Sequence, residues 1–435
     1  MESEALARAV IAKLRGAGHQ AYLVGGSVRD LLLGAKPKDF DVSTDARPER
    51  IMDLFPKSGQ VGAHFGVVLV RDALAQVEVA TFRSDHDYAD GRRPASVHFE
   101  SDPREDVLRR DFTINGLMME AETGEVLDYV GGRADLERRV VRAIGDPDVR
   151  FREDHLRLVR AIRFAARLGF EIDSTTFEAM VRHHALILKV SAERVHEELT
   201  RILIEGGARR GFELLDASGM LAALLPEVAA MKGVGQPPQF HPEGDVWAHT
   251  LLLLEGLGRA TPTLAWGALL HDVGKPPTFR VAERIRFDGH VEEGVKLAHG
   301  ILNRLRFSRD DMERVEALIA NHMRFKDAHR MKQSTLKRFL RMPGFGDHLE
   351  LHRLDCLASN RNLENYDLVK RKLEELPIEQ LKPSPLVTGT DLIAEGYEPG
   401  PRFAEMLAAV EDAQLEGRLG SRDEALAMVR EMFPR

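Results

Sequence analysis

The chain has 435 residues, 43% of them hydrophobic and 30% charged, which is the balance of a globular protein of roughly two to four domains. Its net charge of −8 argues mildly against nucleic-acid binding, although an acidic protein can still carry a basic groove. A single cysteine, Cys356, forms no intrachain disulfide and suits a reducing cytosol. No segment is long and apolar enough to cross a bilayer, and the N-terminus predicts an amphipathic helix rather than a signal peptide. We therefore expect a cytoplasmic protein without a membrane partner.

The first part of the chain mixes strand and helix patterns. Ala21–Val24 predicts a strand, Gly25–Gly26 a turn, and Ser27–Leu33 a short helix. The β-branched segments Val67–Val70 and Val77–Phe82 predict further strands. A small mixed α/β head is therefore expected.

After about residue 148 the apolar residues recur at helical spacing almost to the end. Segments 233–242 and 382–385 are rich in glycine or proline and are typical of linkers. The sequence thus predicts an α+β chain with four parts: a head at 1–140, an all-helical neck at 141–235, a helical body at 236–375 and a helical tail at 376–435.

Two short motifs in the head predict a site for a triphosphate and its metal ions. Gly25-Gly26 joins a predicted strand to a predicted helix, so backbone N–H groups at the helix N-terminus can bind phosphate at close range. Asp39 and Asp41 are two residues apart, a spacing that points both carboxylates to one face of a strand. Such a pair can hold Mg²⁺ ions, one activating a 3′-hydroxyl and the other neutralising pyrophosphate. Either motif alone is more often a turn or a solvated loop, but their order on one strand–turn–helix–strand unit favours nucleotidyl transfer.

Four motifs in order resemble the class II tRNA nucleotidyltransferase and bacterial poly(A) polymerase family. They are YLVGGSVRDLLLGAKPKDFDVST (22–44), DGRRP (90–94), RRDFTIN (109–115) and EDHLRLVRAIRF (153–164), and the resemblance covers roughly the first 205 residues. The resemblance implies contacts to the incoming nucleotide from Gly26, Arg29 and Arg110, to its ribose from Asp111, and to the metal ions from Asp39 and Asp41.

In the neck, Asp154, Arg157, Arg160, Arg163 and Arg167 recur every three or four residues, which predicts one face of a helix. Cytosine and adenine each present an amino donor beside a ring-nitrogen acceptor, whereas guanine and uracil present a carbonyl beside an N–H. A carboxylate only accepts and a guanidinium only donates, so an Asp–Arg pair would select C and A. The alternative is a solvated face with intrahelical ion pairs. The resemblance assigns Asp154 and Arg157 to the base, and Arg160 and Arg163 to phosphates.

A second cluster lies in LLHDVGKP, where His271 and Asp272 are adjacent; His249 lies upstream and Asp355 downstream. Histidine and aspartate side chains from separate helices can bind one or two divalent metals. This pattern resembles the HD phosphohydrolase superfamily over roughly 241–357. His290 and His322 resemble the extra histidines of two-metal members, whereas Asn321 replaces a second histidine and argues against a full two-metal site. The alternative is a degenerate domain with ordinary histidines.

Together these patterns predict a nucleotidyltransferase that adds C, C and A to the 3′ end of tRNA from CTP and ATP without a template. We expect Mg²⁺ in the head and a divalent transition metal of unknown identity in the body, with a possible phosphohydrolase activity there. The alternatives are a poly(A) polymerase or A-adding enzyme and a phosphohydrolase with an RNA-binding head. Segment 61–67 resembles the CCA-adding pattern more closely, but Phe65-Gly66-Val67 stands in place of the usual His-Gly-Thr and weakens that assignment. Glu78 is either a third carboxylate or a partner of Arg83 or Arg110.

Overall fold

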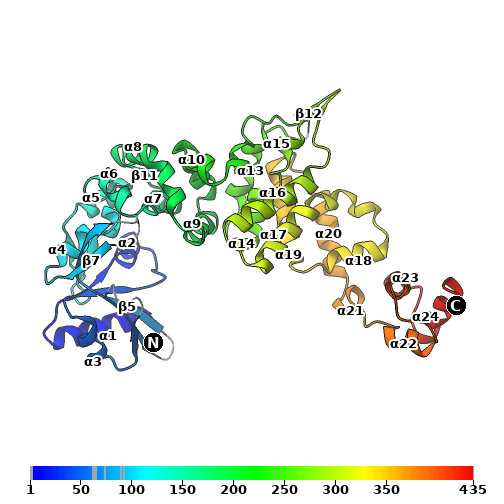
Figure 1. Ribbon diagram of the computed structural model, residues 1–435, viewed down its shortest axis with the longest axis horizontal. Coiled ribbons are helices and arrows are strands. Elements are labelled where there is room, and N and C mark those ends of the chain that lie inside the picture. The colour runs from blue at the N-terminus through cyan, green and yellow to red at the C-terminus, as the bar shows by residue number, and fades with distance from the viewer. Residues whose placement is uncertain are drawn as a thin grey trace. The chain divides into compact units, whose positions relative to one another are not determined.

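The computed structural model describes residues 3–60, 66–72, 75–88, 91, 94–239 and 241–434. The chain divides into two compact units, one formed by Met1–Ala229 with Asn303–Phe307 and the other by Ala230–Leu302 with Ser308–Arg435. The first contains a sheet and helices, and the second is almost entirely helical (Figure 1). The predicted α+β class with a helical body is thereby confirmed. Among the described residues, none of the helices has the length and apolarity needed to span a membrane.

Seven strands of the first unit form one sheet in the order β3-β4-β5-β2-β1-β8-β9. β2 and β5 pair in parallel and the other neighbours pair antiparallel. Both segments expected as strands after β1 are confirmed, since they form β4 and most of β5. The bounds are β1 Ala21–Val24, β2 Asp41–Thr44, β3 Ser58–Gln60, β4 Val67–Asp72, β5 Ala75–Thr81, β8 Leu117–Met119 and β9 Val126–Asp128.

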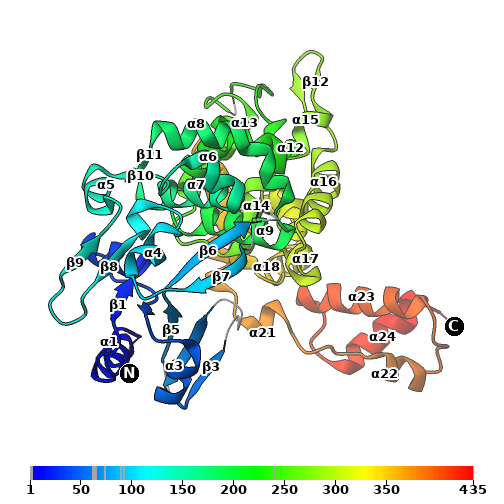
Figure 2. The ribbon, with the colours of Figure 1, turned by 60° about the vertical axis from the view of Figure 1, so that its left-hand side comes forward.

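Short helices and a hairpin surround this sheet. α1 packs on β1, β2 and β5 through an apolar face that is fully buried, as expected for a 3.6-residue period. β6 and β7 pair as a separate hairpin, seen in cyan in Figure 2. Most of the DGRRP motif at its turn lies outside the described residues. The bounds are α1 Ser3–Gly16, α2 Gly26–Leu32, α3 Pro48–Leu54, β6 Arg83–Tyr88, β7 Pro94–Phe99, α4 Pro103–Leu108, η2 Thr113–Asn115 and α5 Gly132–Arg138.

The neck is built on α7, which packs against α9 and α10. Its apolar side is buried, and Gly169 ends it in the left-handed conformation (φ 64°), where glycine carries no steric penalty. β10 (Val140–Val141) and β11 (Glu171–Ile172) form a short parallel pair. The helices are α6 Pro147–Glu153, α7 Arg157–Leu168, α8 Ser174–His183, η3 His184–Lys189, α9 Ala192–Ile204, α10 Ala208–Ala217, α11 Met220–Leu224 and α12 Pro226–Ala229.

The second unit begins in the segment expected to be a linker. Gln236 in that segment is buried and accepts a hydrogen bond from Lys275 Nζ at 2.6 Å, so this part of 233–242 is packed rather than free. Its helices are α13 Val246–Gly256, α14 Pro262–Leu270, α15 Lys275–Thr278, α16 His290–Arg304, α17 Arg309–Asn321, η4 His322–Arg330, α18 Gln333–Leu340, α19 Phe345–Ala358, α20 Glu364–Glu375 and α21 Ile378–Leu381, with a small hairpin β12 Arg280–Val281 and β13 Ile285–Arg286.

The tail helices α22 (Gly389–Ala394), α23 (Arg402–Leu415) and α24 (Arg422–Met432) share a small core of their own. α23 also docks on α18, where Lys337 Nζ donates to the backbone oxygen of Leu415 at 2.8 Å. Arg338 and Arg341 both pair with Glu411 on α23. The tail thus packs on the body.

Candidate functional site

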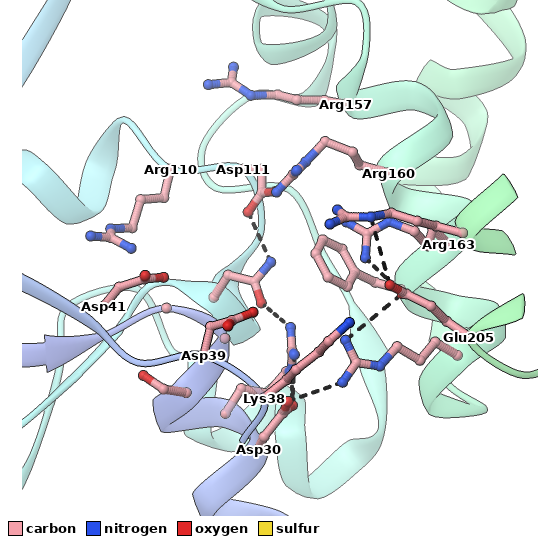
Figure 3. A pocket seen from close by; sticks show the side chains of 18 of the residues that line it. Asp30, Lys38, Asp39, Asp41, Arg110, Asp111, Arg157, Arg160, Arg163 and Glu205 are labelled. Atoms are coloured by element: carbon pink, nitrogen blue, oxygen red, sulfur yellow. Dashed lines mark hydrogen bonds and ion pairs between the residues drawn. The ribbon is translucent and has the colours of Figure 1, made fainter. Parts of the chain in front are cut away.

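A pocket of about 460 Å³ opens in the first unit, a size typical of small-ligand sites. All of the nucleotide-site residues expected from the sequence line it: Gly26, Arg29, Asp39, Asp41, Arg110, Asp111, Asp154, Arg157, Arg160 and Arg163. Figure 3 shows the two aspartates on one wall and the arginines of α7 on the opposite wall. Four segments that lie far apart in the sequence therefore meet at one place.

The turn between β1 and α2 forms one wall of the pocket. Gly25 has φ 69° and ψ −133°, a conformation that L side chains rarely adopt. A Cβ atom there would also lie 3.2 Å from Arg110 Nη1. No side chain caps the N-terminus of α2, so its first backbone N–H groups remain available to an anionic group.

The carboxylates lie beside this turn. Asp41 is the first residue of β2, and Asp39 precedes it by two residues. Glu78 on β5 is the direct neighbour of Asp41 in the parallel register, which favours its role as a third carboxylate over the alternative of an arginine partner. Burial, together with the negative charges of Glu78 and Asp39, raises the pKa of Asp41 to about 6 against the opposing effect of Arg110. A divalent cation would relieve this crowding of negative charge, so the oxygen donor set fits Mg²⁺.

Arg110 reaches the pocket because a buried aspartate holds it. Asp106 on α4 is fully buried, and its Oδ2 accepts from Arg110 Nη2 at 2.9 Å while its Oδ1 accepts from Arg109 Nη2 at 2.6 Å. Burial alone would raise the pKa of Asp106, but the two guanidinium groups lower it to about 2. Asp106 was not identified from the sequence, although it lies three and four residues before the two arginines, a spacing at which helical side chains meet.

A chain of hydrogen bonds connects the two walls. Arg29 Nη1 donates to Asn115 Oδ1 at 2.6 Å, Asn115 Nδ2 donates to Asp111 Oδ1 at 3.0 Å, and Arg160 Nη2 donates to Asp111 Oδ2 at 2.6 Å. Burial opposes ionisation of Asp111, but Arg160 and Asn115 lower its pKa below the ordinary range. Asn115, the last residue of RRDFTIN, was not singled out from the sequence. It fixes the distance between residues expected to bind nucleotide.

The structure corrects one expectation about Asp154. It does not lie on the helix of the arginines, because α6 ends at Glu153 and α7 begins at Arg157. Asp154 has an extended backbone, and its Oδ1 accepts from the backbone N–H of Leu156 at 3.1 Å. An aspartate that binds the backbone two residues ahead competes with helix formation and favours a turn, which explains the break.

Asp154 and Arg157 use only some of their hydrogen-bond acceptors and donors within the described part of the chain. Arg157 donates through Nη1 to Arg150 O and Glu153 Oε2, and through Nη2 to Arg109 O. A guanidinium has five N–H groups, so Nε–H and one Nη2–H have no partner among the described residues. Asp154 Oδ2 likewise accepts no hydrogen bond there. The turn therefore retains one acceptor beside two donors on the pocket wall.

Arg163 is less available than the sequence suggested. It is buried, its Nε donates to Glu198 Oε2 at 2.6 Å, and its Nη1 donates to Glu205 Oε2 at 3.3 Å. Neither glutamate was identified from the sequence. His155 is also buried: its backbone N–H donates to Gly91 O, and a Cβ atom on Gly91 would lie 2.1 Å from its ring.

The second unit brings together all four residues expected to bind metal there. His249 comes from α13, His271 and Asp272 follow α14, and Asp355 comes from α19. His249 Nε2 lies 3.1 Å from Asp355 Oδ1, and His271 Nε2 lies 3.2 Å from Asp272 Oδ2. The ligand atoms of His249, His271 and Asp355 lie within 4.8 Å of one another, a separation that one ion could bridge, and Asp272 forms a second such group with His290 and His322.

The extra histidines face the same aspartate. His290 Nε2 and His322 Nε2 each lie 3.9 Å from Asp272 Oδ1. The Nδ1 atoms of both, and of His271, point at backbone oxygens at 2.6–2.9 Å, so Nδ1 carries the proton and the Nε2 lone pair faces Asp272. This second-layer support is the usual arrangement for histidine metal ligands. All of these Nε2 atoms are buried without a well-directed hydrogen bond among the described residues, which fits the chemistry of a divalent metal.

Further charged groups surround this centre. Glu243 Oε1 lies 2.7 Å from His249 Nδ1. Although burial opposes it, Asp355 and Glu243 raise the pKa of His249 to about 9, so a metal would displace a proton on binding. Lys275 Nζ lies 2.6 Å from Asp272 Oδ2; the sequence analysis did not single it out, although it follows Asp272 by one helical turn.

Comparisons with known proteins agree with this geometry. The family "Poly A polymerase head domain" matches residues 21–142, "Probable RNA and SrmB-binding site of polymerase A" matches 169–232, and "HD domain" matches 245–343. The fold and the pocket therefore define a nucleotidyltransferase with a poly(A) polymerase head and an HD domain.

The relatives narrow this class. A CCA-adding enzyme from Levilactobacillus brevis is 33% identical over 97% of this chain and 96% of its own, and one from Streptococcus thermophilus is 32% identical over 96% and 94%. The crystal structure of the Bacillus stearothermophilus CCA-adding enzyme in complex with CTP superposes with a TM-score of 0.78 at 26% identity, over 99% of both chains. The chain belongs to the CCA-adding enzyme family, which confirms the predicted class over a poly(A) polymerase or a phosphohydrolase with an RNA-binding head.

Proposed function

We propose that the pocket of the first unit is where this chain extends tRNA, by attack of the terminal 3′-hydroxyl on the α-phosphate of CTP or ATP. The observation that carries this assignment is the meeting of three of the four sequence motifs, 22–44, 109–115 and 153–164, in one pocket. Related solved structures contain CTP, ATP or tRNA. The experiment that tests it is nucleotide addition by the purified chain to a tRNA that lacks its 3′ end.

Each wall has its own task in this proposal. Asp39 and Asp41 hold Mg²⁺, which when bound activates the hydroxyl and neutralises the leaving pyrophosphate. The uncapped N-terminus of α2, with Gly26, Arg29 and Arg110, binds the phosphates. Asp111 orients the ribose, and Arg160 and Arg163 add positive charge along the phosphates.

The turn at Asp154 reads the base. Its free Oδ2 accepts from the amino group of cytosine or adenine, and the remaining N–H groups of Arg157 donate to the adjacent ring nitrogen. A carbonyl facing Asp154 and an N–H facing Arg157 would both be mismatched, which excludes uracil and guanine. Selection then needs no nucleic-acid template.

For the second unit we propose a divalent transition-metal centre with phosphohydrolase activity, held by His249, His271, Asp272 and Asp355. The support is the set of buried Nε2 atoms that face carboxylates while their Nδ1 atoms are held by other groups. His290 and His322 place further nitrogen donors at Asp272 Oδ1, which favours two ions despite Asn321.

We expect Asp272→Ala to lose bound metal and any hydrolysis of a phosphomonoester or a 2′,3′-cyclic nucleotide, while nucleotide addition is retained, because the two sites belong to separate units. Metal content by mass spectrometry and hydrolysis with added Mn²⁺, Ni²⁺, Co²⁺ or Mg²⁺ measure this. Asp288→Ala, an exposed aspartate of the same unit, is the matched control. Wild-type protein that binds no metal and hydrolyses neither substrate would show that this unit is a scaffold.

We further propose that the boundaries near residues 140, 235 and 375 separate parts with distinct tasks: nucleotidyl transfer, base selection, the metal centre and a tail. We also place the chain in the cytoplasm, where tRNA is processed in bacteria.

A further inference from the structure

Three guanidinium groups at one corner of the nucleotide pocket converge on a single carboxylate. Glu205 follows the last residue of α9 and lies beside Arg163 in the pocket (Figure 3). Arg167 and Arg201 line the same pocket. The Oε2 atom of Glu205 lies 3.3 Å from Arg163 Nη1 and 4.0 Å from Arg167 Nη1, and its Oε1 lies 3.8 Å from Arg201 Nε. Of these four residues, only Arg163 has a role in the function proposed above, as a positive charge along the phosphates.

The other acidic partners of these arginines are of a different kind. Glu198 and Asp30 are buried and pair with Arg163 and Arg167 at 2.6 and 3.1 Å. Glu205 is 24% exposed, and its ion pairs are longer. Glu198 and Asp30 therefore hold the guanidinium groups of two arginines in place, whereas Glu205 contacts the same groups more weakly.

We propose that Glu205 occupies a phosphate subsite formed by Arg163, Arg167 and Arg201, and that a phosphate group of the substrate displaces it. This proposal rests on the function proposed for the pocket, and it adds Glu205 as a residue that sets the affinity of the pocket for a phosphate group. Carboxylate and phosphate oxygens take the same guanidinium donors, so the exchange preserves the hydrogen bonds of the arginines while the glutamate turns to solvent.

The exchange has a measurable consequence for affinity. A phosphate that enters the corner must break three ion pairs and meets a negative charge until Glu205 moves away. Replacing the carboxylate with a neutral amide removes both costs and leaves the arginines in place, because Glu198 and Asp30 still hold two of them. The phosphate that displaces Glu205 belongs to either the triphosphate or the RNA backbone, and these two sources can be separated.

The test is the dissociation constant of Glu205→Gln in two arms, one with CTP and Mg²⁺ but no RNA, and one with tRNA lacking its 3′ end but no nucleotide. We expect binding to tighten about threefold to fivefold in one arm, as expected for losing partly exposed ion pairs. Glu197→Gln is the matched control: it removes the same charge from α9 at a side chain that also neighbours Arg201, at 3.8 Å, but is 67% exposed and outside the pocket. We expect it to leave both constants unchanged.

Tightening in the CTP arm assigns the subsite to the triphosphate, and tightening in the tRNA arm assigns it to the RNA backbone. Unchanged or weaker binding in both arms, or an equal shift in Glu197→Gln, would overturn the proposal. Arg201→Gln provides an independent check if Glu205→Gln does not fold, because Arg201 lies at the surface. Loss of this guanidinium should weaken binding in one of the two arms. Neither measurement depends on turnover, so a failure of this proposal is distinguishable from a failure of nucleotide addition.

Discussion

Asp39→Ala and Asp41→Ala should each abolish nucleotide addition while the binding of tRNA is retained. The two carboxylates lie together at the start of β2, and Glu78 adds a third negative charge beside Asp41. Loss of either one removes a metal ligand, and metal-assisted charge stabilisation supplies several kcal/mol of the barrier reduction. We expect the rate to fall by at least about a thousandfold.

The measurement is the initial rate of addition to a truncated tRNA at saturating CTP, together with a filter-binding constant for that tRNA. Asp53→Ala on α3 is the control, because Asp53 is exposed and does not line the pocket. Turnover near the wild-type rate in either variant would mean that the metal ions are held elsewhere. Parallel loss of tRNA binding would instead indicate a structural role for the aspartate.

Asp154→Ala should reduce the preference for CTP and ATP over UTP and GTP while part of the activity persists. The substitution removes the acceptor whose charge opposes a carbonyl at that position, so the two disfavoured nucleotides gain relative to the other two. A bidentate base contact contributes about 1–3 kcal/mol of discrimination, so the ratio of kcat/KM values should fall roughly tenfold to a hundredfold.

The comparison variant is Arg160→Ala, which should weaken all four nucleotides about equally, because Arg160 pairs with Asp111 rather than facing the base. The kcat/KM for each nucleotide on the same truncated tRNA gives both results. If Asp154→Ala slows all four nucleotides in parallel, the residue supports the turn at α7 and does not read the base.

The nucleotide pocket could be predicted from the sequence because its residues occur in compact motifs. A strand–Gly-Gly–helix turn and an Asp-x-Asp pair each predict a local geometry. Their order along the chain predicted the class of protein, a nucleotidyltransferase. Asp154 shows the limit of periodicity: its spacing fits a helix, but its side chain binds the backbone N–H of Leu156 and breaks the helix there. This local hydrogen bond determines the backbone conformation at Asp154, and residue spacing alone could not predict it.

Contacts between distant segments could not be predicted in the same way. Glu198 and Glu205 lie 35 and 42 residues beyond Arg163 and reach it only because α9 packs on α7. Arginines at helical spacing predicted an open basic face, whereas the structure shows a face whose charges are largely matched. In the second unit the ligand types were recognisable, but Glu243 and Lys275 emerged only from the packing around them.

The most direct test of the central claim counts the nucleotides that the purified chain adds to a tRNA lacking its 3′ CCA. With CTP alone we expect two additions, and with CTP and ATP together three additions followed by a stop; UTP and GTP should give none. Product lengths at single-nucleotide resolution measure this. A long run of adenylates with ATP, or no cytidine addition together with a single adenosine added only to a tRNA supplied with its two cytidines, would contradict the claim that this one pocket builds the whole CCA end.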